Sequence, residues 1–299
     1  MKIQEILAKS SRKAARRHAF FNLIAPAMLF LLTLATTLSA GSLLSGEEYL
    51  STSGLLQGLP FAFATIFIVG AHAFGHYLTA RTHGVGAYLP YFVPKLGIAG
   101  TAGAYTKMKW PISDRNSLIR IFTIGPIAGF CASWLLFTIG LNMSRIIDEQ
   151  TSQYSVTLGD SLITYLTERL IFGQVPENKD VLLHPLAYAG WMGLYYNCWH
   201  LLPIGKLDGG RILYALFGLK KTKWISWCSI IILVILGFIW SGWIAMAIFG
   251  ALCMINVRDQ YPTENYTDEI QKTQPLLIVI ALLILIVSFA PIPIHIMGI

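Results

Sequence analysis

The residues with the clearest capacity for chemistry are two histidines placed four positions apart in an apolar stretch. His72 and His76 belong to the sequence AHAFGH. Residues at i and i+4 share one face of a helix, so two imidazoles there can reach a single ion, as in zinc sites. Within a membrane span each imidazole also needs a polar partner, which favours a functional pair over two incidental histidines. A structural pair or a proton relay is the alternative.

One acid at comparable depth could supply a third metal ligand. Asp208 lies in the sequence LLPIGKLDGG, where Pro203 and three glycines interrupt the helix. Irregular backbone at membrane depth is tolerated where it lines a cavity or is buried in protein. An ordinary turn is the alternative, because Asp-Gly is a common turn pair. The two histidines together with this acid favour a shared site.

The elements that carry these residues are apolar enough to cross a membrane. Charged residues make up 12% of the 299 positions, about half of the ~25% usual in soluble domains, and the mean hydropathy is +0.60. This composition excludes soluble, disordered and collagenous classes. Spans need about 20 apolar residues, and the candidates are 20–38, 60–80, 118–141, 184–202, 224–257 (one tilted helix or a hairpin) and 275–296. The sequence predicts an all-α multi-pass membrane protein with six or seven transmembrane helices.

The net charge of +7 is concentrated at the N-terminus. Six of the 22 basic residues and one acid fall within residues 1–17, and the segments 83–117 and 219–223 are also basic. The positive-inside rule places these three segments in the cytoplasm. No basic face recurs elsewhere, so we expect contact with the lipid bilayer and no nucleic-acid binding. We expect a basic cytoplasmic tail over 1–19 and a single transmembrane domain over 20–299.

Smaller features suggest how the spans are arranged. Gly125 and Gly129 form a small-xxx-small face that could pack the third span against the helices that carry the polar groups. A weakly strand-like run over 100–109 predicts a small membrane-associated β element within 83–117, with a plain surface loop as the alternative. The amphipathic stretch 158–172 predicts a helix on the outer membrane surface or an ordinary loop helix.

The HxxxH pair, the Gly-Pro helix and the LDG sequence, in this order, resemble the site-2 protease family of intramembrane zinc metalloproteases. That family has HExxH on one helix and LDG or DG on a later one. The resemblance covers about 61–217, which we expect to be a metalloprotease core with three catalytic helices. It implies that His72, His76 and Asp208 bind one zinc ion, and that a zinc-activated water hydrolyses a peptide bond in a transmembrane segment of a substrate. The function it implies is regulated intramembrane proteolysis.

The chain departs from this family directly after the first histidine. The family has a glutamate there as general base, and this chain has Ala73. General acid–base groups typically contribute about 10²–10⁴-fold to the rate, so we expect zinc binding with activity lost or very low. Three accounts are open. The chain is an engineered inactive variant, a natural pseudoprotease or non-catalytic membrane adaptor, or an enzyme with a different base, such as Asp114 or Glu168.

A second departure lies directly before Leu-Leu-Pro. The family often has an asparagine there that holds the substrate backbone, whereas this chain has His200, with Asn197 one helical turn earlier. We interpret both as candidate substrate-binding residues. Oxyanion stabilisation or helix capping are alternatives for His200.

The expected partner is a transmembrane protein or peptide. The family is described as using an edge strand to unfold its substrate, and the β element in 83–117 is the candidate for such β-addition. A transporter could also carry intramembrane His and Asp on broken helices, but it would usually show a repeat, and the sequence has none. The short architecture suggests a bacterial inner membrane, and no particular oligomer is predicted.

Overall fold

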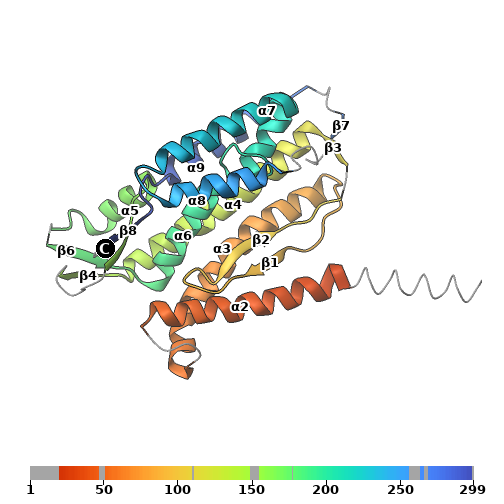
Figure 1. The fold of residues 1–299 in the computed structure, drawn as a ribbon. Coiled ribbons are helices and arrows are strands. Elements are labelled where there is room, and N and C mark those ends of the chain that lie inside the picture. Colours follow the sequence, from red (N-terminus) through yellow and green to blue (C-terminus); the bar gives the residue numbers. More distant parts are fainter. Residues whose placement is uncertain are drawn as a thin grey trace, which may run out of the picture.

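The computed structural model describes residues 20–46, 51–109, 111–148, 155–176, 178–255, 263–265 and 269–297. The predicted basic tail over 1–19 lies outside them. Within the described residues the chain is mostly helical (Figure 1). A π-helical turn η1 (Phe20–Ile24) precedes the α-helices, which are α2 (Ala25–Leu44), α3 (Thr52–Thr82), α4 (Arg115–Asn142), α5 (Leu162–Phe172), α6 (Pro185–His200), α7 (Asp208–Leu236), α8 (Gly242–Cys253) and α9 (Gln274–Ser288).

Three of the described helices have the length and apolarity needed to cross a membrane. They are the helix over Asn22–Leu44, α3 and α4, whereas α8 and α9 are apolar but have only 12 and 15 residues. The predicted count of six or seven spans is therefore not shown. The run 224–257 is divided, because α7 ends at Leu236 and α8 begins at Gly242 and packs against α7. This favours the hairpin alternative over one long tilted helix.

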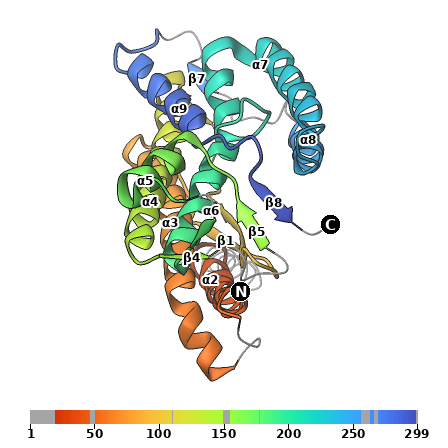
Figure 2. The same cartoon turned by 90° about the vertical axis from the view of Figure 1, so that its left-hand side faces the viewer.

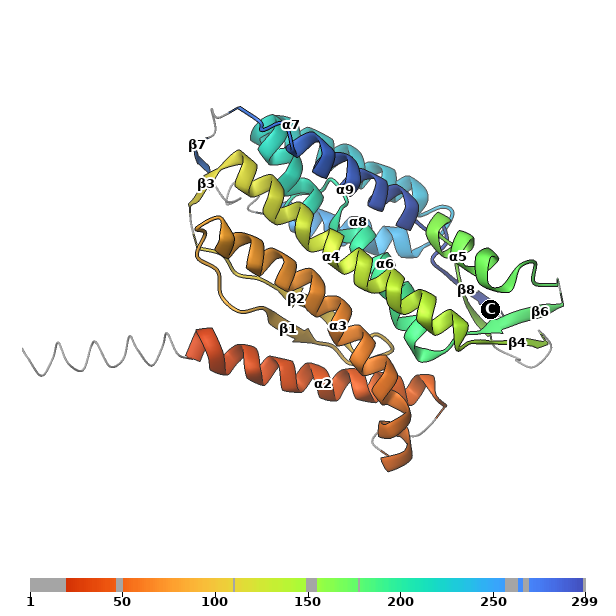
Figure 3. The same ribbon diagram turned by 180° about the vertical axis from the view of Figure 1, so that it is seen from behind.

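The α4 helix lies in the middle of the helical assembly. It packs against α3, α6, α7 and α9, while α2 packs against α3. Figure 1 shows α2 along one edge and α7 with α9 along the opposite edge, and Figure 3 shows α4 between them from behind. The close approach of α3 and α4 depends on glycine, since a Cβ on Gly75 would lie 2.9 Å from the Cα of Gly125.

Four two-stranded sheets correct the all-α expectation. Their strands are β1 (Tyr91–Pro94) with β2 (Thr101–Tyr105), β3 (Ile112–Asp114) with β7 (Thr263–Asn265), β4 (Arg145–Asp148) with β6 (Lys179–Leu182), and β5 (Ser155–Leu158) with β8 (Ile294–Met297). The antiparallel β1–β2 hairpin confirms the β element predicted within 83–117. The other three pairs were not predicted, because each joins short segments that are distant in sequence; Figure 2 shows β5 beside β8.

Candidate metal centre

Three helices bring the predicted polar residues to one buried place. His72 and His76 lie on the inner face of α3, with 1% and 6% of their surfaces exposed. His200 is the last residue of α6. Asp208 is the first residue of α7 and is 4% exposed. The turn over 201–207 joins α6 to α7 and so returns the chain to the same level.

The side chains of α3 and α7 converge on a small triangle of atoms. The Nε2 atom of His72 lies 3.1 Å from Oδ2 of Asp208 and 3.1 Å from Nε2 of His76. The third side, from Nε2 of His76 to Oδ2 of Asp208, is 3.3 Å. Zinc bonds of about 2.0–2.2 Å in tetrahedral geometry place neighbouring ligand atoms about 3.3 Å apart. The triangle therefore has the size of one face of a zinc coordination sphere.

The tautomer of each imidazole follows from the partner of its other nitrogen. Nδ1 of His76 lies 2.7 Å from the backbone carbonyl of Ile121, which can only accept, so Nδ1 carries the proton. Nδ1 of His72 lies 2.8 Å from Oδ1 of Asn197. The amide orientation is fixed because Nδ2 of Asn197 donates to the carbonyl of Gly193 at 2.7 Å. When the imidazoles are neutral, these contacts leave the lone pair of each ring on Nε2, which faces the triangle.

In that form, three electron-pair donors face one another. Such an arrangement is repulsive in an apolar interior unless a cation occupies its centre. Two imidazole nitrogens and one carboxylate oxygen form a donor set that suits Zn²⁺. The contacts from Asn197 and Ile121 are the outer hydrogen bonds that orient metal-bound histidines. The residues present therefore fit a zinc ion.

The predicted Gly-Pro helix supports this centre from α4. A Cβ added to Gly125 would collide with the ring of His76, and one added to Gly129 would collide with the amide of Asn197. Both glycines thus allow α4 to lie directly against the histidine helix and against α6. This confirms the packing expected from their spacing.

Ala73 lies at the point where the β1–β2 hairpin meets α3. Its side chain is buried, and its backbone carbonyl accepts a hydrogen bond from Oγ1 of Thr106 at 3.0 Å. Gly103 of β2 packs against Tyr196 of α6. The hairpin is therefore attached directly to the wall of the candidate site.

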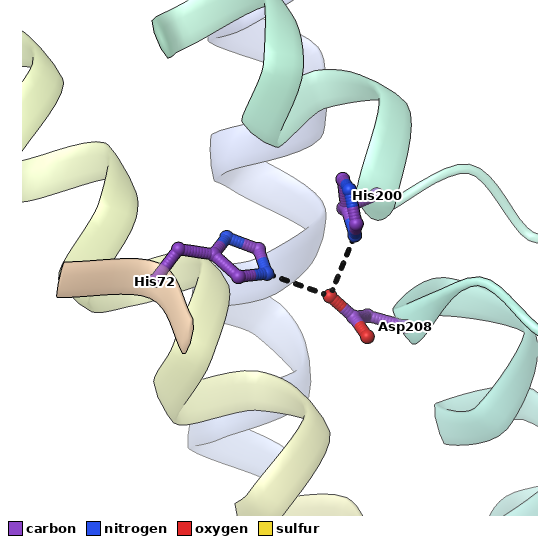
Figure 4. Close-up of side chains that lie close together, drawn as sticks. All are labelled: His72, His200 and Asp208. Carbon is purple, nitrogen blue, oxygen red and sulfur yellow. Dashed lines mark hydrogen bonds and ion pairs between the residues drawn. The ribbon is translucent and has the colours of Figure 1, made fainter. Parts of the chain in front are cut away.

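The two predicted substrate-binding residues, Asn197 and His200, both lie beside the triangle. Asn197 is fully buried and contacts His72 rather than an open surface. His200 directs Nδ1 toward Oδ2 of Asp208 at 3.3 Å (Figure 4). Sequence reasoning missed the carbonyl of Ile121, which has no side-chain signature. It also missed Tyr196, whose ring packs against His72 and His200 and which reads as an ordinary aromatic in the sequence.

The alternative acids lie away from this triangle. Asp114 caps α4 by accepting from the backbone and hydroxyl of Ser117, seven residues before Ile121. That separation is about 10 Å along the helix. Glu168 follows Thr167, which contacts Trp134 about 20 Å beyond Ile121 along α4. Neither position suits a base that acts at the triangle.

Comparison with known proteins finds a matching family and several relatives. Residues 60–240, more than half of the chain, match the model of peptidase family M50. The "Probable zinc metalloprotease EGY2, chloroplastic" of Arabidopsis thaliana is 32% identical over 219 residues, covering 71% of this chain and 38% of that protein. The "Probable zinc metalloprotease EGY1, chloroplastic" of the same plant is 31% identical over 240 residues, covering 78% of this chain and 43% of that protein. The chain thus spans less than half the length of these relatives.

Proposed function

The chain belongs to peptidase family M50, the site-2 protease family, and we propose that it is an intramembrane zinc metalloprotease scaffold whose site binds one zinc ion through His72, His76 and Asp208. The observation that carries the proposal is the triangle of three electron-pair donors with sides of 3.1–3.3 Å. The outer contacts of Asn197 and Ile121 support it, because they hold both imidazoles in the tautomer that a metal requires.

The scaffold would act on transmembrane segments of membrane-protein substrates. A bound zinc ion would supply Lewis acidity that activates water and polarises a scissile carbonyl. Each strand of the β1–β2 hairpin has a single strand partner among the described residues, which leaves an edge for an added substrate strand. The contact from Thr106 to the Ala73 carbonyl supports a role for this hairpin next to the proposed site. A strand-like substrate backbone there would be free of helical hydrogen bonds.

The side chain at position 73 limits how much cleavage this scaffold can perform. Ala73 has no group that can take a proton from water or return one to the leaving amine. Absence of that group would by itself lower activity by about 10²–10⁴-fold, the usual contribution of such a group. The positions of Asp114 and Glu168 weaken the account in which another acid serves as base. An engineered inactive variant and a natural pseudoprotease stay open, and Ala73 equally suits a non-catalytic membrane adaptor.

We further propose an integral membrane location with the N-terminus in the cytoplasm. The three candidate spans among the described residues support the membrane location. The curated relatives carry the word "chloroplastic" in their names, so they do not support the expected bacterial inner membrane, which stays a prediction.

Zinc content of the purified full chain tests the proposed site. We expect one zinc ion per chain, lost in His72→Ala and in Asp208→Ala and kept in the control His83→Ala. The control residue, His83, follows the last residue of α3, lies outside the triangle and contacts Arg120. Full zinc retention in Asp208→Ala would remove this carboxylate from the site, and absence of zinc from the unmodified chain would overturn the proposal.

A further inference from the structure

His200 turns its ring into the candidate metal centre from the end of α6 (Figure 4). Its ring centroid lies 4.7 Å from that of His72, and Nδ1 lies 3.3 Å from Oδ2 of Asp208. The ligand atoms of these three residues all lie within 4.8 Å of one another. The imidazole therefore lies beside two of the residues that would hold the ion.

The carboxylate oxygen of Asp208 that His200 approaches indicates whether His200 is a metal ligand or a supporting hydrogen-bond donor. Oδ2 of Asp208 is the atom that also faces His72 and His76, and so is the oxygen directed at the ion. A supporting donor would be expected on the other oxygen, Oδ1, and at about 2.7–2.9 Å, the usual length of a charge-assisted N–H···O bond. The 3.3 Å separation instead matches the distance of about 3.3 Å between two ligands of tetrahedral zinc.

A neighbouring aromatic side chain holds the imidazole in this orientation. Tyr196 lies one helical turn before His200, and the two ring centroids are 4.3 Å apart. The tyrosine ring also lies 5.5 Å from His72 and packs on Gly103 of the β2 strand. The packing of Tyr196 between α3 and β2 limits rotation of His200 away from Asp208.

We propose that His200 is a fourth protein ligand, so that this chain binds zinc in a closed site of three imidazoles and one carboxylate. The inference rests on the zinc site proposed above. Catalytic zinc sites keep one position open for water or substrate, whereas structural zinc sites are closed by four protein ligands. Ala73 and His200 then both indicate a site that does not catalyse, because it has neither a general base nor an open position. The zinc ion joins α3, α6 and α7.

X-ray absorption at the zinc edge of the unmodified full chain tests this without any substitution. Imidazole rings give characteristic multiple scattering, so the number of bound histidines can be fitted. We expect three imidazoles and one carboxylate oxygen in a four-coordinate site. Two imidazoles with a further oxygen from water would overturn the proposal, while leaving the zinc site of His72, His76 and Asp208 intact.

Zinc affinity of a matched pair of variants provides the second readout. We expect His200→Asn to weaken zinc binding by more than about 100-fold, because loss of a ligand should exceed the loss of about 10–100-fold that follows removal of an outer-sphere partner. The control His184→Asn makes the same substitution at the opposite end of α6, where asparagine can still cap the helix. Its affinity should equal that of the unmodified chain.

The outcomes distinguish this inference from the proposed function on which it rests. Two bound imidazoles in His200→Asn, against three in the unmodified chain, would support the closed site even if the variant is less stable. Equal zinc affinity and an unchanged imidazole count in His200→Asn would remove His200 as a ligand and leave the three-residue site standing. An unmodified chain that binds no zinc would overturn both.

Discussion

The contact between Asn197 and His72 provides the sharpest test of how the metal centre is organised. Oδ1 of Asn197 accepts a hydrogen bond from the N–H at Nδ1 of His72 at 2.8 Å, and both residues are buried. Substitution Asn197→Ala removes the acceptor and leaves a buried N–H without a partner. Leaving such a group unsatisfied costs about 1–3 kcal/mol. If this cost falls on the zinc-bound form, it corresponds to a loss of about 5- to 140-fold in zinc affinity, at 1.4 kcal/mol per tenfold.

The usual contribution of outer hydrogen bonds to metal affinity predicts a loss of similar size. Removal of an outer hydrogen-bond partner from metal-bound histidines typically costs about 10–100-fold in metal affinity. We therefore expect zinc affinity of Asn197→Ala to be weaker by one to two orders of magnitude, with stoichiometry still one. Titration against a chromophoric chelator in detergent micelles measures it.

Asn142→Ala is the matched control for this experiment. Asn142 ends α4 and donates to the carbonyl of Thr138 at an exposed position, so its loss should leave zinc affinity unchanged. Helical content measured by circular dichroism shows whether both variants are folded. A folded Asn197→Ala variant that binds zinc within about threefold of the unmodified chain would refute the argument that this amide fixes the imidazole, since it contradicts the expected loss.

Four further results are expected. Gly125→Ala should abolish zinc binding, because the added methyl collides with the imidazole of His76. Gly70→Ala should keep its zinc, because the nearest atom to its added methyl is 3.7 Å away. Measured zinc content compares the two variants. Removal of zinc by a chelator should lower the melting temperature, and a free zinc concentration about 1,000 times the Kd should restore about 4 kcal/mol. Burial, with acidic neighbours, raises the pKa of Glu168 from 4.5 to about 7. The folded protein therefore loses stability as the pH rises from about 4.5 to about 7, because the unfolded chain gives up this proton first. The melting temperature of Glu168→Gln should exceed that of the unmodified chain by an amount that grows from about pH 5 to about pH 8. Cleavage of a reconstituted transmembrane peptide should appear when Ala73→Glu is combined with His200→Asn; cleavage by Ala73→Glu alone would contradict the closed site.

The sequence predicted the residues of the candidate site better than the hydrogen bonds that orient them. Spacing of four residues placed His72 and His76 on one helix face, and the glycine-rich break identified Asp208. The structure brings all three together. The backbone carbonyl of Ile121 is invisible to residue-type reasoning, because every residue has one. The position of Asn197 behind His72 depends on how α6 packs, which local pattern does not encode.

The number of spans was less predictable for a physical reason. Hydropathy reports how apolar a stretch is, but not where backbone geometry divides it. Gly218 has φ of 75° and interrupts α7, and residues 237–241 separate α7 from α8. The strand pairs, except for the local β1–β2 hairpin, join distant segments whose pairing depends on the tertiary fold.

The order of synthesis gives the convergence of α3 and α7 a consequence for assembly. Asp208 follows His76 by 132 residues. At about 5–20 residues per second, the ribosome needs about 7 to 26 s to cover that interval. During this time α3 already carries two imidazoles whose acidic partner does not yet exist. The cluster can close only after the ribosome has passed Asp208, so α3 must be held near its final position until α7 is made.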